Sequence, residues 1–177
     1  MTPIEILRWQ LRLSWSLAEL RLTGLTDAAC LWEPAPGAWT VRRGEDGRWR
    51  PDWVEPEPDP PLTATLGWLT WHLSWWWSEL LAHATGAPVP AREDVEWPGC
   101  ADAVVAGLIG LHGGWAAVLE TADLDRPVAF PWPEPRPMVN AAAWANQELM
   151  KNVAEIGQLR DLHEVLSRSG DQRHRPR

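Results

Sequence analysis

Apolar residues recur at steps of three and four in four separate segments, and this spacing constrains the fold more than any other feature of the chain. In the first segment, apolar residues from Ile4 to Leu22 lie on one helix face, with Thr2 placed to cap it and Pro3 to occupy its first turn. The four expected helices cover about 4–22, 63–83, 104–122 and 139–166. No segment alternates with period two for long enough to predict a sheet. The expected fold is therefore all-α, a four-helix bundle.

The connection between the first two helices, residues 24–61, is long and rich in proline. Proline lacks the amide hydrogen that helices and central strands need, so we expect this segment to be a loop. Four tryptophans within it favour a loop pinned onto the bundle, where fastening is their more ordinary role and ligand contact is the alternative. They are Trp32, Trp39, Trp49 and Trp53.

The length of 177 residues suits one domain, expected over 1–167, followed by a flexible basic tail over 168–177. The arginines of the tail are Arg168, Arg173, Arg175 and Arg177. The formal net charge of −8 argues against a nucleic-acid partner, because phosphate recognition depends on clustered lysine and arginine.

The cysteines and the apolar runs bear on the compartment. Cys30 and Cys100 are far apart and in no CxxC arrangement, so neither a disulfide framework nor a thiolate zinc site is expected. The N-terminal stretch carries charges and lacks a small-residue cleavage site, so it does not resemble a signal peptide. The tryptophan-rich run over 68–77 is interrupted by polar residues, which argues against a membrane span. We expect a cytoplasmic protein without a membrane partner.

The first helix carries a second apolar stripe, which widens its apolar surface beyond what one neighbouring helix covers. The stripe consists of Ile6, Leu13, Leu17 and Leu20. A face of this kind suits contact with another subunit, so the chain is expected to form a homodimer.

Two stretches, PGAWTVRRGEDGRW…DWVEPEPDPPLTATLGWLTWHL and NQELMKNVAEIGQLRDL, together with their order around two helical hairpins, resemble the actinobacterial branch of the DinB-like family. That family consists of four-helix bundles and includes mycothiol- and bacillithiol-dependent transferases and isomerases. The resemblance covers most of residues 4–166. It implies a homodimer and a divalent metal, often zinc or nickel, held by one histidine of the second helix and a His-x-x-x-His pair of the fourth.

Carried over onto this chain, the resemblance places His72 at the second-helix position and Lys151 and Glu155 at the fourth-helix pair. Lysine as an ammonium has no lone pair to give and repels a cation. The implied ligand set therefore shrinks to His72 and Glu155.

A different set of ligands is also available on the same helix stripe. Glu148, Asn152 and Glu155 are four and three residues apart, and with His72 they offer two carboxylates, an amide and an imidazole. The alternative is a structural charge ladder of Glu148, Lys151 and Glu155, and structural ion pairs are the commoner outcome of such spacing. His72 itself is either a ligand or a histidine of the core or cleft whose ring nitrogens are satisfied by its neighbours.

The other candidate residues carry weaker signals. His83 lies near a predicted helix end, His112 suits the surface or packing better than the cleft, and His163 follows the inward stripe too loosely. Cys30 has no adjacent base in the sequence and is not a persuasive nucleophile. No GxGxxG, P-loop, GxSxG or HExxH motif occurs, so nucleotide, serine-hydrolase and zincin functions have no support.

Three functions follow as hypotheses. The first is a metal-dependent transferase or isomerase with a degenerate metal site, acting with a low-molecular-weight thiol of the mycothiol type. The second is a non-catalytic protein that binds a small apolar or aromatic ligand in a tryptophan-lined cleft. The third is a structural homodimer without a small ligand.

Overall fold

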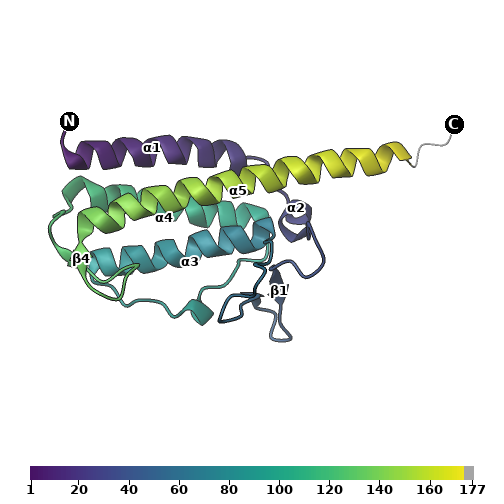
Figure 1. The fold of residues 1–177 in the computed structure, drawn as a ribbon, viewed down its shortest axis with the longest axis horizontal. Helices are drawn as coiled ribbons and strands as arrows, with labels where there is room; N and C mark the ends of the chain where they lie inside the picture. Colours follow the sequence, from purple (N-terminus) through teal and green to yellow (C-terminus); the bar gives the residue numbers. More distant parts are fainter. Residues whose placement is uncertain (174–177) are drawn as a thin grey trace.

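Four long helices form the body of the computed structural model, which describes residues 1–173 (Figure 1). They are α1 (Pro3–Leu22), α3 (Leu66–Thr85), α4 (Ala101–Thr121) and α5 (Met138–Arg173). Helix α1 packs against α4 and α5, and α3 packs against the same two helices, so each helix has two neighbours around a shared core. Helices α1 and α5 run in one direction, and α3 and α4 run in the other (Figure 1). The predicted all-α four-helix bundle is confirmed.

The helix ends follow the sequence signals closely except at the C-terminus. Thr2 forms a capping box with Glu5, and the Thr65 hydroxyl accepts a hydrogen bond from the amide of Trp68. Helix α3 ends at Gly86, whose φ of 75° is the left-handed conformation that glycine adopts without strain. Helix α5 continues to Arg173, beyond the predicted end at residue 166. Residues 168–173 of the predicted flexible tail are thus helical, and the rest of that tail lies outside the described residues.

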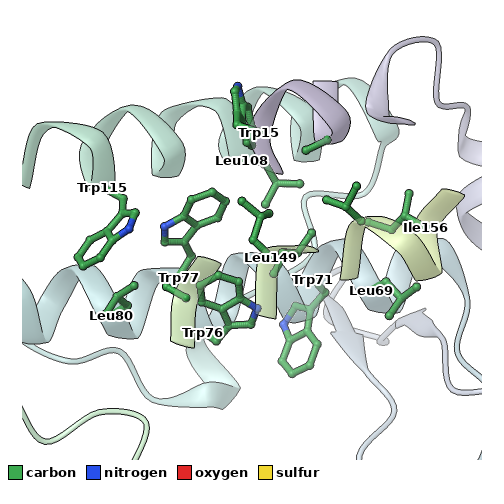
Figure 2. Close-up of a cluster of buried hydrophobic side chains, with 14 of the residues drawn as sticks. Trp15, Leu69, Trp71, Trp76, Trp77, Leu80, Leu108, Trp115, Leu149 and Ile156 are labelled. Atoms are coloured by element: carbon green, nitrogen blue, oxygen red, sulfur yellow. The ribbon is translucent and has the colours of Figure 1, made fainter. Parts of the chain in front are cut away.

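The core is built largely from indole rings. Figure 2 shows Trp15 from α1, Trp77 from α3 and Trp115 from α4 together with leucine and isoleucine side chains of α5. Each large aromatic side chain removes about 150–250 Å² of surface from water, so these rings dominate the hydrophobic stabilisation of the bundle. The unusual tryptophan content thus has a structural role in the helix packing.

The proline-rich connection is more regular than we predicted. It contains a short helix, α2 (Asp27–Leu31), and an antiparallel hairpin of β1 (Val41–Arg43) and β2 (Trp49–Pro51). The Asp46-Gly47 pair at the turn, with φ of 80° at Gly47, is a strong hairpin signal that the proline count obscured. A second small hairpin pairs β3 (Pro127–Val128) with β4 (Arg136–Pro137). The expectation of a plain loop and of no strand pairing was therefore wrong at these places.

Tryptophans fasten this connection to the bundle, as predicted. Trp39 and Trp53 lie against Trp68 of α3, with ring centroids 5.1 and 6.2 Å from it. Trp49 meets Trp97 edge-on at 5.3 Å, and Trp97 belongs to the linker between α3 and α4. The linker also contains the short 3₁₀ helix η1 (Arg92–Asp94). These aromatic contacts place the connection over one end of α3, where it forms part of a cavity.

Helix α4 is long and apolar enough to cross a membrane on length and composition alone. The tryptophan-rich run of α3 considered from the sequence is not the segment that meets this criterion. In the structure α4 packs along α3 and α1 through Leu108, Trp115 and Leu119, all fully buried. A single such helix is weak evidence for a membrane span, because a bundle helix passes the same test.

Candidate functional site

A cavity of about 390 Å³ lies between α3, α5 and the proline-rich connection. Trp39 and Trp68 form its aromatic wall, and His72 continues that wall because its ring stacks on Trp68 at a centroid distance of 5.1 Å. Leucine side chains complete the apolar lining. The polar end of the cavity is formed by His72, Lys151, Asn152 and Glu155. The volume is within the range of pockets that bind small organic molecules.

Asn152 is the centre of a hydrogen-bond network at the polar end. Its side chain is fully buried, and its Oδ1 lies 3.3 Å from His72 Nδ1 and accepts a bond of 3.3 Å from Trp76 Nε1. Its Nδ2 donates to Glu148 Oε1 at 3.3 Å and lies 3.5 Å from Glu155 Oε2. The structure thus brings together the four residues that the sequence singled out, because α3 and α5 face each other at this level.

Lys151 forms an ion pair within this network. Its Nζ lies 2.6 Å from Glu148 Oε1, and the Glu148 side chain is only 15% exposed. The Lys151 side chain is 53% exposed, so the pair joins a solvent-accessible ammonium to a largely buried carboxylate. Of the charge-ladder alternative, the structure contains the Glu148–Lys151 pair, whereas Glu155 contacts Asn152 and forms no ion pair with any described residue.

The surroundings shift two of the titratable groups. Burial lowers the pKa of His72, and the nearby Glu148 charge and the Asn152 contact oppose this shift only in part. Burial raises the pKa of Glu155, and Lys151 acts in the opposite direction. At neutral pH the imidazole of His72 is therefore neutral and able to donate or accept a hydrogen bond at the cavity wall.

We predict that the free energy of unfolding decreases as the pH is lowered from about 7.5 to about 5.5. In the His72→Gln variant this decrease should be smaller. The folded-state pKa of His72 lies below its ordinary value of 6.5, so within this window the unfolded chain binds more protons and acid favours unfolding. His112 has a lowered pKa for the same reason, burial, so His112→Gln should remove a separate part of the fall. Urea unfolding at each pH measures both. An unchanged pH dependence in His72→Gln would contradict the assignment.

The sequence itself matches a known protein family. The model of the DinB superfamily matches residues 44–156, which is more than half of the chain and includes α3, α4, the second hairpin and the site-forming part of α5. This chain belongs to the DinB superfamily. A search of curated proteins found no match.

The family resemblance implies a divalent metal, but the described residues do not assemble a histidine, cysteine and carboxylate cluster for one. Among the described residues no group of three or more histidine, cysteine, aspartate and glutamate side chains is placed to hold an ion. His72 Nδ1 faces Asn152, and Glu148 is paired with the Lys151 ammonium. A divalent cation would have to compete with the Lys151 ammonium for the Glu148 carboxylate, which opposes binding. As metal ligands, His72, Glu148, Asn152 and Glu155 stay a prediction.

The remaining candidates of this DinB-superfamily chain have packing roles. His112 stacks on Trp15 with centroids 4.2 Å apart, and His163 lies near Trp32 at 5.3 Å; neither lines the cavity. Cys30 is fully buried, and burial raises its pKa to about 12, so it is not a nucleophile. Trp39, for which fastening was the expected role and ligand contact the alternative, both fastens the connection and lines the cavity.

Proposed function

We propose that this DinB-superfamily protein binds a small organic molecule in the cavity between α3 and α5 without a metal ion. The observation that carries the proposal is the Glu148–Lys151 ion pair of 2.6 Å beside His72, because it places an ammonium at the polar end and pairs it with the Glu148 carboxylate. The walls supplied by Trp39 and Trp68 suit an apolar or aromatic body. The neutral His72 and the buried Asn152 suit a hydrogen-bonding group at one end of the ligand.

The family resemblance favours a second candidate, a metal-dependent thiol S-transferase or isomerase of the mycothiol type. In such an enzyme His72 and Glu155 would hold a zinc or nickel ion, and the metal would favour the thiolate form of the thiol. The two candidates differ in metal content. If the protein binds its ligand without a metal, the purified untagged chain should contain less than about a tenth of an equivalent of zinc or nickel. A competent metal site would retain its ion.

The binding proposal is tested with 1-anilinonaphthalene-8-sulfonate as a fluorescent probe of an aromatic-lined cavity. We expect the probe to bind the native protein and Leu159→Trp to weaken binding roughly tenfold, because Leu159 lines the cavity and a larger ring fills it. Leu162→Trp is the matched control, since Leu162 is an exposed residue on the same helix outside the cavity lining. Equal weakening in both variants, or in neither, would refute the proposal. Stoichiometric metal would favour the second candidate instead.

We also propose that the protein is a cytoplasmic homodimer, with the outer face of α1 at the contact. The predicted second stripe of α1 is exposed and apolar, and Trp9, 52% exposed, extends it. Both cysteines are free, as suits a reducing compartment. Sedimentation should give the mass of two chains, and Leu13→Glu with Leu17→Glu should give one, because buried unpaired charges oppose association. Leu162→Glu with Val165→Glu on α5 is the control and should remain dimeric.

A further inference from the structure

A second cavity of about 500 Å³ lies on the other side of His72, between α3, the start of α5 and the segment 129–133 that follows β3. His72 lines both cavities and stands between them. Five tryptophan and phenylalanine rings line the second cavity, together with the imidazoles of His72 and His83. The five rings are Trp75, Trp76, Phe130, Trp132 and Trp144.

The rings of this second cavity are held by one another. Trp144 meets Trp76 edge-on with centroids 5.3 Å apart, and Phe130 meets Trp144 edge-on, also at 5.3 Å. On its other side Phe130 lies against His83 at 5.7 Å. Aromatic side chains fixed in this way present preformed ring faces to a ligand and lose little conformational freedom when it binds.

The one carboxylate of the lining belongs to Glu79. Trp75 Nε1 donates to Glu79 Oε1 at 3.0 Å, which orients the carboxylate while its second oxygen remains available. No lysine or arginine lines the cavity, and Glu79 forms no ion pair with any residue in the described part of the chain. A single negative charge among ring faces, which are themselves electronegative, favours a positively charged ligand.

One ring of the cavity already accepts a cation in the structure. The guanidinium carbon of Arg136 lies 4.5 Å from the centroid of the Trp132 ring, at the rim formed by the β3–β4 hairpin. Arg136 is not part of the cavity lining. The contact shows that the Trp132 ring takes part in a cation–π interaction, here with an arginine of the chain itself.

We propose that this second cavity binds a methylated organic cation, with a quaternary or tertiary ammonium enclosed by the tryptophan rings and its charge balanced by Glu79. A primary ammonium carries three N–H donors, and this lining offers one charged acceptor for them. A quaternary ammonium has no N–H to satisfy and presents methyl groups to the ring faces. The site is separate from the cavity of the proposed function, and the two share only His72.

The test compares choline with 3,3-dimethylbutan-1-ol, a neutral molecule of nearly the same shape, by titration calorimetry on the full chain. We expect choline to bind at least about tenfold more tightly than the neutral alcohol. Glu79→Gln keeps an acceptor for Trp75 and should remove most of that preference. Trp132→Leu, at a half-buried position of the hairpin loop, should weaken choline about fivefold or more without affecting the core.

Two controls separate this site from the first cavity. Glu57→Gln removes a carboxylate that lines only the first cavity, and Leu159→Trp fills that cavity, so both variants should bind choline as the native protein does. Equal affinity for choline and the alcohol, absence of choline binding, or an unchanged preference in Glu79→Gln would overturn the proposal. A loss of choline binding in Leu159→Trp would also overturn it, whereas loss of the naphthalene probe alone in that variant would not.

Discussion

The protein with both Lys151→His and Glu155→His is expected to take up about one equivalent of zinc or nickel per chain, where the native protein takes up almost none. The two positions are four residues apart on α5, so the new imidazoles lie on one helix face opposite His72 of α3. The change removes the ammonium that opposes a cation and supplies neutral nitrogen donors. Three histidines with one open position are a common catalytic zinc arrangement. Metal analysis after dialysis, followed by calorimetry, measures the gain.

The third ligand of this designed site is tested by adding His72→Ala to the double variant. Two imidazoles four residues apart bind a metal weakly by themselves, so loss of His72 should lower the affinity by roughly tenfold or more. Lys151→Gln alone is a second control, because it removes the ammonium without adding a donor. If the double variant takes up no metal, or if His72→Ala does not weaken it, then α3 and α5 do not face each other as the structure has them.

The fold could be read from the sequence wherever local signals and packing agree. The capping box at Thr2, the cap at Thr65 and the left-handed Gly86 fixed three helix ends to within about two residues. The end of α5 was set too early because residues after 166 are polar and lack an apolar stripe. That part of α5 extends past the other helices in Figure 1, so its helical state owes little to core burial. Periodicity arguments do not detect a helix of this kind.

The candidate site could be predicted as a set of residues but not as a set of interactions. Helical spacing placed Glu148, Asn152 and Glu155 on one stripe, and the structure brings that stripe to His72. The sequence offered the Glu148–Lys151 pair only as one alternative, and it could not determine that Asn152 would take the central position. Those outcomes depend on rotamers and on the depth of each side chain, which spacing does not define. The second cavity was missed because two of its rings, Phe130 and Trp132, come from a proline-rich turn without periodicity.

Replacing Trp97 by alanine is expected to lower the free energy of unfolding by about 3–5 kcal/mol, or roughly 6–20 °C in Tm for a chain of this size. Trp97 is 1% exposed, and its Nε1 donates to Thr70 Oγ1 of α3 at 3.1 Å. Its backbone amide also donates to the carbonyl of Trp49 at 3.2 Å, so the residue joins the α3–α4 linker to the first hairpin. Trp97 therefore fills space in the core and also links the α3–α4 linker to α3 and to the first hairpin. Urea and thermal unfolding measure the loss.

A matched pair of phenylalanine variants separates the hydrogen bond from the packing. Trp115 is as deeply buried as Trp97, but its Nε1 has no hydrogen-bond partner among the described residues. Trp115→Phe removes volume and also removes an unsatisfied donor, whose desolvation had cost stability. Trp97→Phe removes similar volume and breaks a buried bond, so it should cost about 1–2 kcal/mol more than Trp115→Phe. Equal losses would mean that the Thr70 contact contributes nothing and that Trp97 acts through its volume alone.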